Sequence, residues 1–206
     1  MLLRGRVRAL EHRRHPVHAG ARLIASAFAA ALALVLIVLP LQAFAFDAAS
    51  VVRQTIPQAR VQGEGELRMY GFHIYDATLF VGPTGLSSKE LTVRPFALDI
   101  EYGRAFKGAA IAKRGRQEMD ELKVASKAQT AQWQEEMKTI FPDVQPGDHV
   151  IGVFVPERGT TFYADDKVIG TIPGDDFARA FFAIWFDPRT SAPGLRNQLL
   201  ANGAAQ

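Results

Sequence analysis

The sequence predicts an α+β fold, in which two runs of antiparallel strands flank a pair of helices and further helices follow at the end. Residues 61–102 contain stretches that alternate polar and apolar side chains, the period of two expected of a strand with one buried face. The apolar spacing becomes helical over residues 107–141, and strand-like stretches return over residues 149–172. Because strands and helices come in separate runs, this order favours α+β over an alternating α/β fold.

The first two strands are expected over residues 61–69 and 72–81. Tyr70 and Gly71 lie between them, and a two-residue hairpin loop favours glycine. The run of glycine, proline and threonine over residues 82–85 then ends the second strand, as these residues do at turns.

A third strand and two helices follow. Residues 96–102 place Asp99 and Glu101 on one side and apolar residues on the other, so we expect a half-buried strand. Residues 107–123 are rich in helix formers, and a second helix is expected to end at Pro142. The apolar stripe of the second helix consists of Trp133, Met137, Ile140 and Phe141.

The second run of strands leads to the closing helices. Its strands are expected over residues 149–155, 160–163 and 167–172. Asp175 and Asp176 begin an amphipathic helix, where acidic residues oppose the positive end of the helix dipole. Residues 193–201 predict a short final helix.

The first hairpin concentrates polar side chains on one face. With a two-residue loop, Arg68 faces His73 and Glu66 faces Tyr75 across the two strands. These four residues then share one side of the hairpin, and apolar residues occupy the other. We therefore expect a polar cluster on one face and a core on the other.

Residues 1–45 have the pattern of a secretory signal peptide. An arginine-rich stretch precedes an apolar run over residues 23–40, and Ala43 and Ala45 supply the small residues that a signal peptidase requires. The alternative is an uncleaved membrane anchor, although the apolar run is barely long enough to span a bilayer. We expect cleavage near Ala45 and a periplasmic or secreted protein, which contacts the membrane only through the leader if that is retained.

Composition excludes several classes of function. The leader holds six of the 24 Lys and Arg residues and one of the 21 Asp and Glu residues, so residues 46–206 carry 18 basic and 20 acidic groups, a formal charge of −2. This balance argues against nucleic-acid binding, which needs a basic surface on the folded domain. The chain has no cysteine, and beyond the leader only His73 and His149 remain, so we expect no metal site and no cofactor.

Four blocks of sequence carry a family resemblance. They are GEGELRMYGFHIYDATLFV, EYGRAFKGAAIAKRGRQEM, VIGVFVP and KVIGTIPGDDFARAFFAIWF, in that order between residues 60 and 200. This series resembles the chalcone isomerase-like proteins, and in particular the exported bacterial branch of that superfamily. The resemblance implies one such domain over residues 46–206: an open-faced β-sandwich with a large antiparallel sheet, a covering layer of helices, and a ligand cleft between them.

The resemblance also bears on the site. The plant enzymes place an arginine on the first hairpin, and Arg68 matches it; the next family position is Thr in the enzymes and Tyr in fatty-acid-binding relatives, and here it is Tyr75. The enzymes carry a Tyr and an Asn on the first inserted helix, where this chain has Ile111 and Glu118. These departures favour a binder over an enzyme.

The first hypothesis is therefore a non-catalytic binder of a fatty acid or a similar amphipathic acid. Arg68 and Tyr75 would hold the acidic headgroup, since a guanidinium and a phenol both donate to carboxylate oxygens, and His73 lies on the same predicted face. Apolar residues of the helical layer would line the tail: Trp133, Met137 and Phe181. The alternative role for Arg68 is structural pairing with Glu66 or another carboxylate.

Two further hypotheses stay open. The protein could be an isomerase or lyase acting on an unsaturated or phenolic substrate, with His73 as the candidate acid–base group. It could instead be an interaction module with a vestigial cleft, using charged clusters on the two inserted helices, although the sequence names no protein partner. These clusters are Lys113, Arg114 and Arg116 on the first helix and Glu135 and Glu136 on the second.

Overall fold

The computed structural model describes residues 46–87, 89 and 91–201, and it shows a six-stranded antiparallel sheet. The strands are neighbours in sequence order, from β1 at one edge to β6 at the other. Their bounds are β1 Arg60–Met69, β2 Phe72–Val81, β3 Phe96–Tyr102, β4 His149–Val155, β5 Gly159–Ala164 and β6 Lys167–Ile172. The predicted α+β class is confirmed. The predicted signal peptide lies outside the described residues.

Five helices accompany the sheet in the described part of the chain: α2 Ala48–Thr55, α3 Gly108–Leu122, α4 Lys127–Ile140, α5 Asp175–Phe186 and α6 Pro193–Leu200. Helix α3 lies within one residue of its predicted bounds at each end, and α4 ends two residues before Pro142, where its end was predicted. Ser126 starts α4 with a capping box, in which its hydroxyl accepts from the Gln129 N–H while the Gln129 side chain accepts from the Ser126 N–H. None of the helices described is long and apolar enough to cross a membrane.

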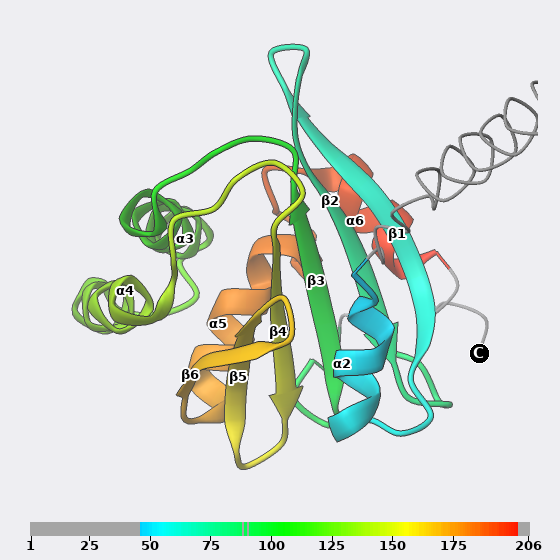
Figure 1. Cartoon of the computed structure of the whole chain (residues 1–206). Helices are drawn as coiled ribbons and strands as arrows, with labels where there is room; N and C mark the ends of the chain where they lie inside the picture. Colours follow the sequence, from blue (N-terminus) through cyan, green and yellow to red (C-terminus); the bar gives the residue numbers. More distant parts are fainter. Residues whose placement is uncertain (1–45, 88, 90, 202–206) are drawn as a thin grey trace, which may run out of the picture. The chain divides into compact units, whose positions relative to one another are not determined.

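Helices cover both faces of the sheet. Figure 1 shows α2 on the near face and α5 and α6 on the far face, while α3 packs against α4 and α5. The far face holds the larger core, which is rich in aromatic rings such as Phe96, Phe182 and Phe186. The near face holds a smaller core of Val51 and Val52 from α2 packed on strand residues.

Helix α2 corrects the prediction for the third strand. That strand was expected to expose Asp99, yet Asp99 is only 5% exposed, and Ala97 beside it is fully buried. The reason is that α2 and the segment before it cover this face, where the ring of Phe46 packs 4.6 Å from that of His149. Asp99 is compensated by His149, whose Nδ1 lies 3.0 Å from both carboxylate oxygens.

The β1–β2 pair is irregular at two points. Near its start, Val61 pairs with Phe80 and Gly63 pairs with Leu79, so Gln62 is an extra residue on β1. The side chain of Gln62 is fully buried and bonds both backbone groups of Leu86, accepting from its N–H at 2.8 Å and donating to its carbonyl at 2.9 Å. This extra residue therefore anchors the loop that follows β2.

Glycines on β1 let α6 approach closely. A Cβ at Gly63 would lie 2.3 Å from the backbone carbonyl oxygens of Gln198 and Leu199, and one at Gly65 would lie 2.2 Å from the Gln198 side chain. These two glycines therefore lie inside a strand and allow the helix to pack against it.

Candidate ligand-binding site

A cavity of about 490 Å³ lies between the far face of the sheet and helices α3 and α5. Most of its wall is apolar, including Leu98, Ile100, Phe162 and Phe181. Its size falls within the range of pockets that hold small organic molecules. The side chains with polar atoms that line it are Arg68, Tyr75, Tyr102, Arg114, Glu118, Trp185 and Ser191.

The second irregularity of the hairpin directs Tyr75 into this cavity. Arg68 pairs with His73 as predicted, but Leu67 pairs with Tyr75, so Ile74 is an extra residue on β2. Such a bulge shifts the following side chains to the opposite face. The predicted pairing of Glu66 with Tyr75 was therefore wrong, and Glu66 pairs with Asp76.

Tyr75 lies among aromatic groups. Its phenol oxygen accepts a hydrogen bond of 3.0 Å from Trp185 Nε1, and its ring meets that of Tyr102 edge-on at 6.4 Å. Burial strongly raises the pKa of Tyr75, so the phenol keeps its proton at neutral pH. Since no acceptor for that proton is found among the described residues, the O–H is available to donate to a bound molecule.

An ion pair, Glu118 with Arg114, lines the same cavity as Tyr75. Glu118 of α3 is only 5% exposed, and it pairs with Arg114 one helical turn earlier. Ser191, in the loop before α6, donates to Glu118 Oε1 at 3.0 Å. The charge of Glu118 raises the pKa of Tyr75 and the charge of Arg114 lowers it. Both charges are therefore close enough to the phenol to act on it.

Arg68 lines the cavity but is not buried in it. Slightly more than half of its side chain is exposed, and its Nε donates to Glu66 Oε1 at 2.8 Å. This hydrogen bond lowers the pKa of Glu66 and raises that of Arg68. The structure thus brings Arg68 and Tyr75 to one cavity from opposite faces of the hairpin, with Arg68 held by the partner that the alternative interpretation named.

His73 lies apart from the cavity. It occupies the outer face of the hairpin, where its Nε2 is 3.0 Å from Asp76 Oδ2. Of the three predicted ligand-binding residues, Arg68 and Tyr75 line the cavity and His73 does not.

The predicted tail-binding residues divide in the same way. Phe181 lines the cavity, whereas Trp133 packs edge-on against Phe177 in the core, 5.7 Å between ring centres, and Met137 is fully buried. Those two residues belong to the side of α4 that packs into the protein interior, which helical spacing alone does not distinguish from a cavity wall.

Sequence reasoning missed three polar residues of the cavity. Arg114 was placed in the charged cluster of the first inserted helix, and neither Trp185 nor Ser191 was considered as a cavity residue. A signal was present for Arg114, because an arginine four residues before a glutamate is a common ion-pair spacing on a helix. Ile111 and Glu118, aligned with the enzyme's Tyr and Asn positions, both line the cavity.

The sheet, its covering helices and the largely apolar cavity between them define a chalcone isomerase-type open-faced β-sandwich. Residues 57–201 match the chalcone isomerase-like family, and the chain belongs to that family.

Two known proteins extend this comparison. An uncharacterized protein of Haemophilus influenzae is 30% identical over 138 residues, which cover 67% of this chain and 66% of that protein. The crystal structure of a fatty-acid binding protein of Arabidopsis thaliana superposes with a TM-score of 0.56 at 9% identity, covering 71% of this chain and 88% of that one. At that identity the likeness establishes the fold alone.

Proposed function

We propose that the protein is an exported, non-catalytic binder of a fatty acid or a similar amphipathic acid. The observation that carries the proposal is the cavity of about 490 Å³, whose wall is largely apolar and whose polar side chains include a buried phenol with an available O–H. An apolar chain fills such a wall favourably because its surface leaves water. The fatty-acid binding neighbour from Arabidopsis supports this class of ligand.

In this proposal the carboxylate accepts the Tyr75 O–H and pairs with a guanidinium. Arg68 and Arg114 both line the cavity, and each is paired with a glutamate, Glu66 and Glu118 respectively. Arg68 has the more exposed partner, so its side chain turns toward a ligand at the lower cost of desolvated charge. Arg68 is therefore the proposed headgroup residue, with Arg114 completing the charge balance around Glu118.

The test is binding of palmitate, measured by native mass spectrometry and by isothermal titration. We expect Arg68→Ala to weaken binding roughly 10- to 100-fold, the effect of losing a hydrogen bond to a charged group. Tyr75→Phe keeps the ring and removes the O–H, and we expect a smaller loss. Arg189→Ala is the matched control, because Arg189 pairs with Asp187 and does not line the cavity.

Equal palmitate affinity in the wild type, Arg68→Ala and Tyr75→Phe would contradict the headgroup assignment. Absence of palmitate binding by the wild type would contradict the ligand class.

Export is tested by a separate measurement. The intact mass of protein recovered from the periplasmic fraction should correspond to a chain that begins at Phe46, and recovery of the full-length chain from the cytoplasm would contradict export.

A further inference from the structure

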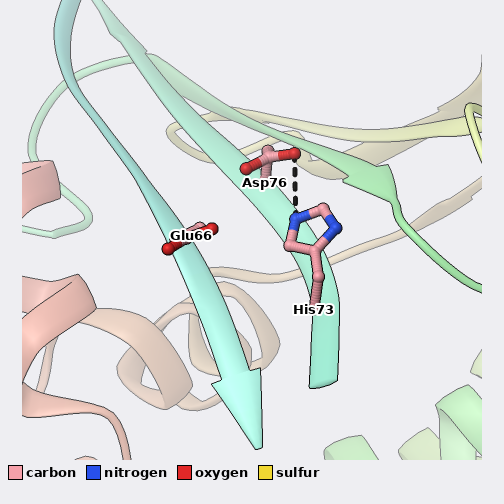
Figure 2. Close-up of side chains that lie close together, drawn as sticks. All are labelled: Glu66, His73 and Asp76. Atoms are coloured by element: carbon pink, nitrogen blue, oxygen red, sulfur yellow. Dashed lines mark ion pairs between the residues drawn. The ribbon is translucent and has the colours of Figure 1, made fainter. Parts of the chain in front are cut away.

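Three potential metal ligands meet on the outer face of the β1–β2 hairpin, away from the cavity. Figure 2 shows Glu66 on β1 and His73 and Asp76 on the neighbouring strand β2. One donor atom from each, two carboxylate oxygens and one imidazole nitrogen, lie within 4.8 Å of one another. We refer to these three residues as the outer cluster.

The backbone builds this cluster in a way that the sequence alone hides. Residues three apart on a regular strand point to opposite faces, so His73 and Asp76 would not meet. The extra residue Ile74 puts them on one side, and the register places Glu66 directly opposite Asp76. The irregularity that turns Tyr75 into the cavity therefore also assembles the outer cluster.

Gly103 leaves room for the imidazole ring of His73. A Cβ at Gly103 would lie 2.3 Å from His73 Nδ1, so the ring occupies the space that glycine leaves. Nε2 is shielded from solvent and lies 3.0 Å from Asp76 Oδ2, but without the alignment of a hydrogen bond. A buried nitrogen without a hydrogen bond has an unused lone pair or proton, and a bound ligand would satisfy it.

The charges of the cluster are also incompletely balanced. Glu66 and Asp76 are two carboxylates, and Arg68, which bonds Glu66, is the cation whose charge acts on both. Two carboxylates against one guanidinium leave an excess of negative charge on this face. A divalent cation would complete the balance and give each donor a partner.

We propose that Glu66, His73 and Asp76 form a Zn²⁺ site. Zinc–nitrogen and zinc–oxygen bonds of about 2.0–2.2 Å place tetrahedral ligand atoms roughly 3.3 Å apart. The His73–Asp76 contact of 3.0 Å is already near that spacing, and Glu66, with an exposed side chain, completes the set by rotating inward. The imidazole favours zinc over the oxygen-preferring Mg²⁺ and Ca²⁺, and three protein ligands leave a position for water.

Zinc bound at this position would replace Arg68 as the partner of the Glu66 carboxylate. The two cations compete for one carboxylate, so Arg68→Ala should tighten zinc binding several-fold rather than weaken it. A purely structural cluster would not show this gain. The zinc proposal does not rest on the proposed fatty-acid function, because all three residues of the outer cluster lie outside the cavity.

The experiment is calorimetric titration of the untagged full chain with ZnCl₂, alongside imidazole NMR signals of His73. We expect at least a tenfold loss of affinity in His73→Ala and in Glu66→Gln, because even residues behind the ligands change metal affinity by that factor. Glu64→Gln is the matched control: it removes the same charge from the same exposed side of β1, two residues from Glu66. The three leader histidines contribute the same background to every variant.

Three results would overturn the proposal: equal zinc affinity in the wild type, His73→Ala and Glu66→Gln; unchanged His73 signals at saturating zinc; or MgCl₂ binding as tightly as ZnCl₂. Thermal unfolding of each zinc-free variant establishes that it folds. Asp76→Asn keeps the shape of the side chain, so an affinity loss there supports the site even if His73→Ala proves unstable.

Discussion

The two faces of the sheet are built from the same strands but differ in the partners of their buried polar groups. On the α2 face, the buried carboxylate of Asp99 is neutralised by His149 on the adjacent strand. On the opposite face, Tyr75, Glu118 and Arg114 line a cavity that leaves the phenol O–H available. One face is therefore closed by its own residues, and the other has room for a molecule from outside.

The largest expected difference between the faces comes from a pair of matched truncations. Ile151 is fully buried in the α2 face, whereas Ile111 is a partly buried residue of the cavity wall. Ile151→Ala should lower the free energy of unfolding by about 2–5 kcal/mol, since it leaves a new void. Ile111→Ala should cost less than half as much, because it enlarges an existing cavity. Urea denaturation of both variants measures this, and equal costs would contradict the contrast.

A smaller effect is expected at the start of α2, the eight-residue helix that covers the closed face. The Asp47 side chain accepts from the Ala49 N–H at 3.0 Å and caps this helix. Asp47→Ala should cost about 0.5–2 kcal/mol in unfolding free energy, with faster hydrogen exchange confined to α2. Asp47→Asn should restore most of the stability, because asparagine caps equally well; failure of that rescue would point to a role other than capping.

The smallest expected effect is a pH dependence on the closed face. Burial lowers the pKa of His149, but the hydrogen bond and charge of Asp99 outweigh it, so the pKa is raised above its ordinary value of 6.5. Burial likewise raises the pKa of Asp99. In both cases the folded protein binds the proton more tightly than the unfolded chain does. For His149 the stabilisation is fully present below pH 6.5 and is lost as the pH rises through the folded-state value.

Urea denaturation at about pH 6 and about pH 8 should therefore show a less stable wild type at the higher pH. His149→Gln should have a flatter dependence, although it is less stable at both values. A variant that keeps the wild-type slope would place the titrating group elsewhere in the protein.

The sequence predicted the strands well, because alternation is a local property. All six strands begin and end within about two residues of their expected positions, and the inserted helices follow their apolar spacing. Helix α2 was missed because it is short and comes soon after the apolar run of residues 23–40, and that omission led to the wrong expectation for Asp99. A helix of this length depends on tertiary packing that no local pattern reveals.

The site was predictable only in part. The family resemblance indicated Arg68 and Tyr75, and both line the cavity. Their actual arrangement depends on Ile74, a single extra residue that changes which side chains share a face. Ordinary alternation assumes a regular ladder, so it placed Tyr75 with Glu66 and did not bring His73 and Asp76 together.

The extra residue Gln62 has a consequence for self-association. β1 is an edge strand, and a long regular edge presents unpaired backbone groups on which a second chain can form another strand. The bulge at Gln62 bends this edge, and its side chain ties the strand to Leu86. The same local irregularity thus makes β1 a poorer template for a second strand than a long regular edge would be.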